Sequence, residues 1–128
     1  MNQMNPVGWF EIYVDDMTRA RTFYESVLAV TLTELPVPPD SGGGEMWAFP
    51  WIQEAPNASG ALVKHEMGKP GATGALLYFS SADCTTELGR VEAAGGKVIS
   101  PKFSIGDYGF IGLASDTEGN TIGFHSMQ

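Results

Sequence analysis

The sequence predicts an α+β fold made of two βαβββ modules that together form an open, barrel-like cleft. A strand pattern, a helical pattern and three further strand patterns follow one another in the first half of the chain, and the same order returns in the second half. An aspartate precedes each predicted helix, Asp16 and Asp83, where its side chain can accept hydrogen bonds from free amides. We therefore predict a single domain with modules at about 5–66 and 74–128, joined by a Gly- and Pro-rich linker at 67–73.

The first predicted strand has two different faces, because successive side chains of a strand point to opposite sides. One face is purely apolar and suits packing under a helix. The other is aromatic and charged, so we expect it to line a wet or ligand-filled cleft. The apolar face consists of Phe10, Ile12 and Val14, and the cleft face consists of Trp9, Glu11 and Tyr13.

The rest of the first module reads as one helix and three strands. Apolar residues recur every three or four positions from about Met17 to Val27, which predicts a helix with one apolar stripe. Strands are then expected at 30–35, 45–51 and 59–66, with a loop at 36–45.

The second module repeats this order. We expect strands at 74–81, 97–105, 108–115 and 120–126, a helix at 84–94 stopped by Gly95 and Gly96, and a hairpin turn at 116–120. Aligning Asp16 with Asp83 matches the cleft face of the first strand with a second set of residues. Leu76, Tyr78 and Ser80 then correspond to Trp9, Glu11 and Tyr13.

Composition excludes several classes of partner. The net charge of −8 argues against nucleic acid and against anionic membrane surfaces, since both need basic patches. The single cysteine, Cys84, rules out an intrachain disulfide and fits a reducing compartment. Neither a signal-peptide pattern at the start nor a run of eighteen apolar residues is present, so we expect a cytoplasmic location.

Three stretches carry a resemblance to a known family. They are FEIYVDDMTRARTFYESVL at 10–28, RVEAAGGKVISP at 90–101 and DTEGNTIGFHS at 116–126. Together with the repeat, they resemble the vicinal oxygen chelate superfamily, the glyoxalase, bleomycin-resistance and extradiol-dioxygenase group. The small bacterial glyoxalase-related proteins are the most similar members. This resemblance implies paired βαβββ modules, a homodimer, and in many members a divalent metal that activates the substrate through two neighbouring oxygens.

The metal ligands that the resemblance implies fall on residues that cannot bind a cation. The first ligand position is Trp9, its counterpart in the second half is Leu76, and the final glutamate position is Gly123. The remaining ligand belongs in the strand at 59–66, where Ala61 and Val63 are the inward candidates. Indole, aliphatic groups and hydrogen donate nothing to a cation, so we expect no resident metal and no other cofactor.

Two titratable residues are the candidates for chemistry. Glu11 either accepts a hydrogen bond from a ligand or acts as a general base, with a pKa raised by Trp9 and Tyr13. The alternatives are a buried carboxylate tied to a structural partner and a residue at a solvated cleft mouth. His125 shares the inward face of the last strand and could pair with Glu11 or bind a displaced metal with it, although it could equally be a surface residue.

Further aromatic residues are candidates for lining the cleft. Trp47, Phe49 and Trp51 alternate onto one face of a predicted strand, where the alternatives are core packing and cleft lining. Phe103 and Tyr108 flank a Gly-Asp turn that forms either a cleft rim or a simple hairpin. The predicted ligand-binding set is Trp9, Glu11, Tyr13, Trp47, Phe49, Tyr78, Phe103 and Tyr108.

Two functions remain open from the sequence. The first is a metal-free protein that binds a small, flat or cationic molecule against Glu11 in an aromatic cleft, as antibiotic-sequestering proteins do. The alternative is a lyase, isomerase or dioxygenase relative with a displaced metal site that includes Glu11 and His125.

Overall fold

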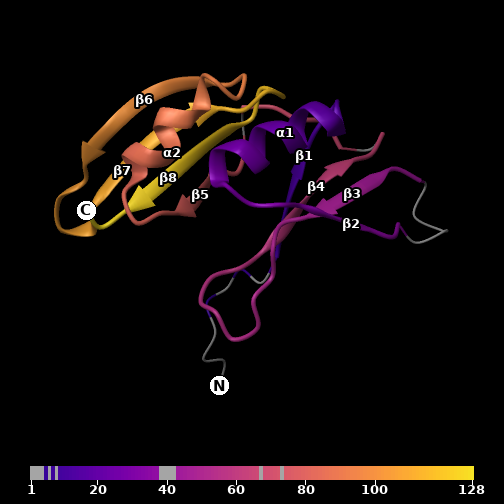
Figure 1. Cartoon of the computed structure of the whole chain (residues 1–128), viewed down its shortest axis with the longest axis horizontal. Helices are drawn as coiled ribbons and strands as arrows, with labels where there is room; N and C mark the ends of the chain where they lie inside the picture. The colour runs from indigo at the N-terminus through magenta and orange to yellow at the C-terminus, as the bar shows by residue number, and fades with distance from the viewer. Residues whose placement is uncertain (1–4, 6, 8, 38–42, 67, 73) are drawn as a thin grey trace.

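The two modules form two separate four-stranded mixed sheets with one α-helix each (Figure 1). The computed structural model describes residues 5, 7, 9–37, 43–66, 68–72 and 74–128. Residues 38–42 of the predicted loop, together with Met67 and Thr73 at the ends of the predicted linker, lie outside the described residues. None of the described helices is both long and apolar enough to cross a lipid bilayer.

The first sheet has the strand order β1-β4-β3-β2, in which β1 and β4 are parallel and the other neighbours antiparallel. In the chain, helix α1 connects β1 to β2. The elements are β1 (Phe10–Tyr13), α1 (Met17–Leu28), β2 (Thr33–Leu35), β3 (Glu45–Ala48) and β4 (Gly60–Lys64).

The second sheet repeats this topology in the order β5-β8-β7-β6, with β5 and β8 parallel. Its elements are β5 (Leu77–Ser80), α2 (Cys84–Val91), β6 (Lys97–Ser104), a short 3₁₀ turn (Gly106–Tyr108), β7 (Phe110–Ser115) and β8 (Thr121–Ser126). The predicted α+β class and the paired βαβββ order are thus confirmed. The barrel stays open, because no strand of one sheet pairs with a strand of the other among the described residues.

Both helices begin where the aspartates predict. The side chain of Asp16 accepts a hydrogen bond from the Arg19 amide at 3.0 Å, and that of Asp83 accepts one from the Thr85 amide, also at 3.0 Å. Each bond satisfies an amide that has no partner within its own helix. Helix α1 ends at Ala29, which takes a left-handed backbone conformation with φ of 55°.

A single core joins the two modules on the helix-covered side of the sheets. The helices α1 and α2 contact each other, and Phe23, Tyr24 and Val27 of α1 are fully buried. An aromatic cluster extends across the junction, with Phe79 of β5 at its centre. The ring of Phe79 lies 5.9–6.1 Å from those of Phe10, Tyr24, Phe49 and Phe124.

The strand predicted at 45–51 is shorter in the structure. Strand β3 stops at Ala48, and residues 49–59 form a loop that projects from the module junction (Figure 1). Pro50 has no amide to extend the ladder. The Ser59 hydroxyl holds the loop base through the carbonyl oxygens of Phe49 and Pro50, at 3.3 and 2.9 Å.

Candidate functional site

Each sheet leaves one face uncovered by its helix, and the first module's uncovered face carries the predicted triad of Trp9, Glu11 and Tyr13. Glu11 lies opposite Ala61 in the β1–β4 register, and Tyr13 lies opposite Val63. The Trp9 Nε1 donates a hydrogen bond to Glu11 Oε2 at 3.3 Å. The two aromatic side chains are 44% and 38% exposed, so they form an open surface rather than a closed pocket.

The burial expected for Glu11 is not found in the single chain. Its side chain is exposed beside Trp9, because the other sheet does not fold over this face. Its hydrogen bond comes from the neutral Trp9 indole, so Glu11 is not part of a core ion pair, and its exposed position at the edge of a cavity is that of a residue at a solvated cleft mouth.

The second module's uncovered face is built around Tyr78, which lies opposite Gly123 in the β5–β8 register. A Cβ atom on Gly123 would lie 2.5 Å from the Tyr78 ring and 3.2 Å from Leu113. The Tyr78 ring therefore occupies the space that any side chain at position 123 would need. Tyr78 itself is 45% exposed.

The residues at the metal positions implied by the resemblance do not fit a metal. The register pairs Ala61 with Glu11 and Gly123 with Tyr78, so these two small residues occupy equivalent places in the two modules. Neither has a donor atom, and Tyr78 blocks the space at Gly123. Among the described residues, no group of three or more His, Cys, Asp and Glu side chains is arranged to hold a metal ion.

His125 and Glu11 have their hydrogen bonds in separate modules. The Nε2 of His125 lies 2.6 Å from the carbonyl oxygen of Tyr108. A carbonyl only accepts, so this ring nitrogen carries the proton and donates it. The predicted pairing of His125 with Glu11 is therefore not formed within the chain.

Two of the predicted ligand-binding residues lie on the helix-covered side of their sheet. Trp47 pairs with Leu62 in the ladder and stacks under the Arg21 guanidinium, whose carbon is 3.4 Å from the ring centroid. Phe49 is 7% exposed and belongs to the core. Both residues therefore pack against the core on the helix-covered side, Trp47 because the register of β3 turns it toward α1, and neither joins the Trp9–Tyr13 face.

The last two predicted residues lie at the far end of the second module. Phe103, on β6, lies opposite Ile111 of β7, faces outward and is 43% exposed. Tyr108 sits in the 3₁₀ turn and is 77% exposed. The register places Phe103 on the same uncovered side as Tyr78 and His125.

A cavity of about 530 Å³ lies where β1 meets the linker and the start of β8. Of the predicted set, Glu11 and Tyr13 line it, together with Leu77 and Thr121 of the second module. This cavity brings the predicted acceptor of the first module next to side chains of the second. Its volume lies in the range of small-molecule sites, about 300–1,000 Å³.

A buried polar network, which the sequence did not reveal, joins the turn between β7 and β8 to the start of α1. The carboxylate of Glu118, in the β7–β8 turn, accepts hydrogen bonds from the amides of Asp15 and Asp16, both at 2.9 Å. It also accepts a bond from Arg19 Nε at 2.7 Å and one from the Thr117 hydroxyl at 2.8 Å. The sequence marked DTEGN only as a hairpin turn, since nothing local signals that this turn packs against the start of α1.

The same turn also holds the end of β1 and the centre of α1. The Tyr24 hydroxyl donates to Asp116 Oδ2 at 2.6 Å, and the Asn120 side-chain amide donates to the Tyr13 carbonyl at 3.0 Å. Burial, followed by the charge of Asp116, raises the pKa of Tyr24 well above its ordinary value. The phenol therefore stays protonated and keeps donating.

Opposing effects act on the pKa of Glu118. Burial, the largest of them, raises it. The hydrogen bonds from Arg19, from Thr117 and from the backbone amides of Asp15 and Asp16 together outweigh burial and hold the pKa at about 2, below the ordinary 4.5. The Glu118 carboxylate is therefore ionised throughout the neutral pH range.

Comparisons with known proteins agree with this architecture. The family model described as "Glyoxalase/Bleomycin resistance protein/Dioxygenase superfamily" matches residues 7–124. CFP32 of Mycobacterium bovis, whose name marks it provisionally as a glyoxylase, is 26% identical over 91% of this chain. The match covers 43% of CFP32, so the chain spans less than half the length of this relative.

Two solved structures illustrate the likeness in fold. An E144Q mutant of glyoxalase I from Zea mays is 20% identical, with a TM-score of 0.73 over 95% of this chain and 47% of that one. TnmS3, an antibiotic-binding protein from Streptomyces sp. CB03234, is 24% identical, with a TM-score of 0.64 over 98% of both chains. Because the family model covers most of the chain, the protein belongs to the glyoxalase/bleomycin resistance protein/dioxygenase superfamily.

Proposed function

We propose that this protein binds a small, flat or cationic organic molecule against the uncovered face that carries Trp9, Glu11 and Tyr13, and that it does so without a metal. The observation that carries the proposal is the composition of this face, which has two partly exposed aromatic rings around one carboxylate. Rings supply apolar contact area and the carboxylate supplies a directed acceptor, a combination typical of ligand sites.

Charge narrows the class of ligand. The chain has a net charge of −8, and Glu11 is the charged residue that β1 contributes to the Trp9–Tyr13 face, while Lys69 of the linker lines the adjacent cavity. Cations and hydrogen-bond donors are favoured at such a surface, whereas anions are repelled. TnmS3, which has a similar fold over its whole length, is described as an antibiotic-binding protein, which is consistent with a sequestering role.

A second copy of the chain would complete the site. Both uncovered faces expose large apolar side chains, which single soluble chains rarely do over contiguous areas. On the first module these are Trp9 and Tyr13, and on the second Leu76, Tyr78 and Phe103. A homodimer that places the two kinds of face against each other would cover these residues and enclose Glu11.

The dimer predicts a specific mass in solution. Sedimentation or light scattering at micromolar concentration is expected to give twice the chain mass of 13.7 kDa. Tyr78→Glu, which adds a charge to one uncovered face, is expected to shift the mass toward that of the single chain without unfolding it, because the side chain is 45% exposed. A wild-type mass of 13.7 kDa at these concentrations would contradict the dimer.

Replacing Glu11 with glutamine tests the binding site. We expect the single chain to keep its fold, with a change in unfolding stability of less than about 0.5 kcal/mol when measured at concentrations where the dimer has dissociated, because the side chain is exposed in the single chain. The affinity for the strongest binder from a thermal-shift panel of flat aromatic compounds is expected to fall at least tenfold, or about 1.4 kcal/mol. Glu34→Gln, the same charge change at an exposed position of β2, is the matched control.

Two results would overturn this proposal. One is unchanged affinity in Glu11→Gln. The other is one equivalent of a transition metal in protein purified without added metal that is lost in His125→Ala. The second result would favour the alternative, a lyase, isomerase or dioxygenase relative with a displaced metal site.

A further inference from the structure

We propose a second ligand site on the helix-covered side of the module junction, which takes a small aryl-alkyl amine. A cavity of about 390 Å³ lies there, between the end of α1, the loop at 49–59 and the start of the second module. Its side chains differ from those of the Trp9–Tyr13 face. The site is therefore independent of the proposed function.

The floor of this cavity is aromatic. The rings of Phe10, Phe49 and Phe79 line it, with centroids 5.7–6.1 Å apart, and Leu28 of α1 closes one side. Such a floor offers apolar and ring-face contact to a flat aromatic body. The volume suits a molecule with one or two rings.

The wall of the cavity is an ordered loop. Asn57 Nδ2 donates to the Ser80 hydroxyl of β5 at 3.1 Å, which ties the loop tip to the second module. Glu54 and Asn57 both take left-handed backbone conformations, with φ of 66° and 75°. For a glutamate this conformation is strained, and strain of this kind is retained where the surrounding structure requires a particular loop shape.

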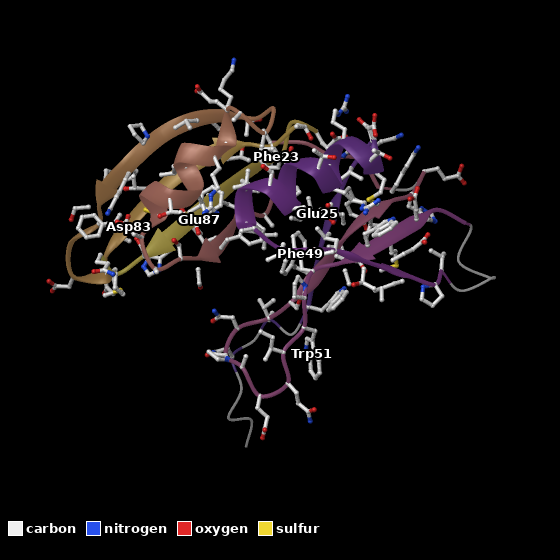
Figure 2. The ribbon with its side chains drawn as sticks, in the orientation of Figure 1. Phe23, Glu25, Phe49, Trp51, Asp83 and Glu87 are labelled. Atoms are coloured by element: carbon white, nitrogen blue, oxygen red, sulfur yellow. The ribbon has the colours of Figure 1, made fainter. Side chains whose placement is uncertain are left out.

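One charged side chain, Glu87 of α2, lines the cavity. Its Oε1 accepts a hydrogen bond from the Ser81 hydroxyl, and no described residue donates to its Oε2. Figure 2 shows Glu87 on α2 and Trp51 on the loop below the junction. A carboxylate beside an aromatic floor suits a protonated amine joined to a ring, because the amine can donate to Oε2 while the ring packs on the phenyl groups.

Tryptamine and indole-3-propionate test this site, because they share a ring and differ in charge. Titration calorimetry at neutral pH is expected to give saturable tryptamine binding with a Kd at or below about 1 mM. Indole-3-propionate should bind at least tenfold more weakly. Glu87→Gln is expected to weaken tryptamine at least tenfold and to remove the preference for the amine. Glu92→Gln, an equal charge change on an exposed residue just after α2, should leave both unchanged.

A second variant tests the same cavity without changing the contact between Ser81 and Glu87. Ala55→Trp adds bulk at an exposed position of the cavity lining and should weaken both compounds, with normal thermal unfolding. Because tryptamine also belongs to the class proposed for the Trp9–Tyr13 face, the titrations are repeated in Glu11→Gln, where the tryptamine binding that depends on Glu87 should persist. The proposal is overturned if tryptamine does not bind, if Glu87→Gln or Ala55→Trp binds it as the wild type does, or if Glu11→Gln abolishes binding, which would move the site to the other face.

Discussion

Replacing Glu118 with glutamine is expected to lower the free energy of unfolding by about 3 kcal/mol, which corresponds to roughly a 10 °C decrease in Tm for a chain of this size. The side chain is completely buried, and every group around its two oxygens is a donor. An amide NH₂ in place of one oxygen would face the Asp15 and Asp16 amides or the Arg19 guanidinium, which can only donate, and would leave these donors unpaired. Urea unfolding followed by circular dichroism measures the loss.

The same residue predicts how stability changes in acid. The folded-state pKa of Glu118 is about 2, below the ordinary 4.5, so the folded chain binds fewer protons than the unfolded chain between these values. The stabilisation is therefore complete above about pH 4.5 and is lost as the pH falls toward 2. In Glu118→Gln, this part of the acid-induced loss of stability should disappear.

Glu92→Gln serves as the control for both measurements, because Glu92 is exposed at the end of α2. It should keep the wild-type Tm within about 2 °C and the wild-type acid profile. If Glu118→Gln unfolds with the wild-type midpoint and the same acid profile, the β7–β8 turn does not clamp the start of α1.

Replacing Phe79 with alanine is expected to destabilise the chain by about 3–4 kcal/mol. Phe79 is the second-module ring through which the aromatic cluster crosses the junction, with Phe10, Tyr24 and Phe49 on one side and Phe124 on the other. Removing it leaves a void between the modules. Denaturant unfolding monitored by tryptophan fluorescence reports mainly on the first module, which contains Trp9, Trp47 and Trp51, whereas amide exchange reports on both.

Phe79→Leu is the graded control. It keeps most of the buried volume and should cost about 1–1.5 kcal/mol, with both modules still unfolding together. If alanine costs no more than leucine, the surrounding rings close the void without penalty, and Phe79 does not hold the modules together.

The order of elements was predictable because each depends on local signals. Asp16 and Asp83 cap their helices as expected, and the apolar spacing after Met17 predicted α1 to within one residue. The predicted end of β3 was wrong. Trp47 and Phe49 alternate as strand residues do, but Pro50 and the hydrogen bonds from Ser59 to the Phe49 and Pro50 carbonyls end the strand. The contact between Ser59 and Phe49 joins residues ten positions apart, so local alternation does not reveal it.

The candidate site was predicted in part. Alternation in β1 correctly put Trp9, Glu11 and Tyr13 on the face without a helix, since side-chain direction in a strand follows from position alone. Burial of Glu11 did not follow, because burial depends on where the second sheet lies. His125 likewise has the expected direction but bonds to Tyr108, a contact set by the 3₁₀ turn.

The amino-acid sequence by itself determined the two modules, the order of their elements and the absence of metal-ligand atoms at Trp9, Leu76 and Gly123, since these follow from periodicity and side-chain chemistry. Only the tertiary structure decided that the modules share a core through Phe79 and that Glu118 is buried against α1. Such contacts join residues about seventy to one hundred positions apart. No local pattern encodes them, because their energy comes from apolar area and hydrogen bonds that exist only once the modules have packed.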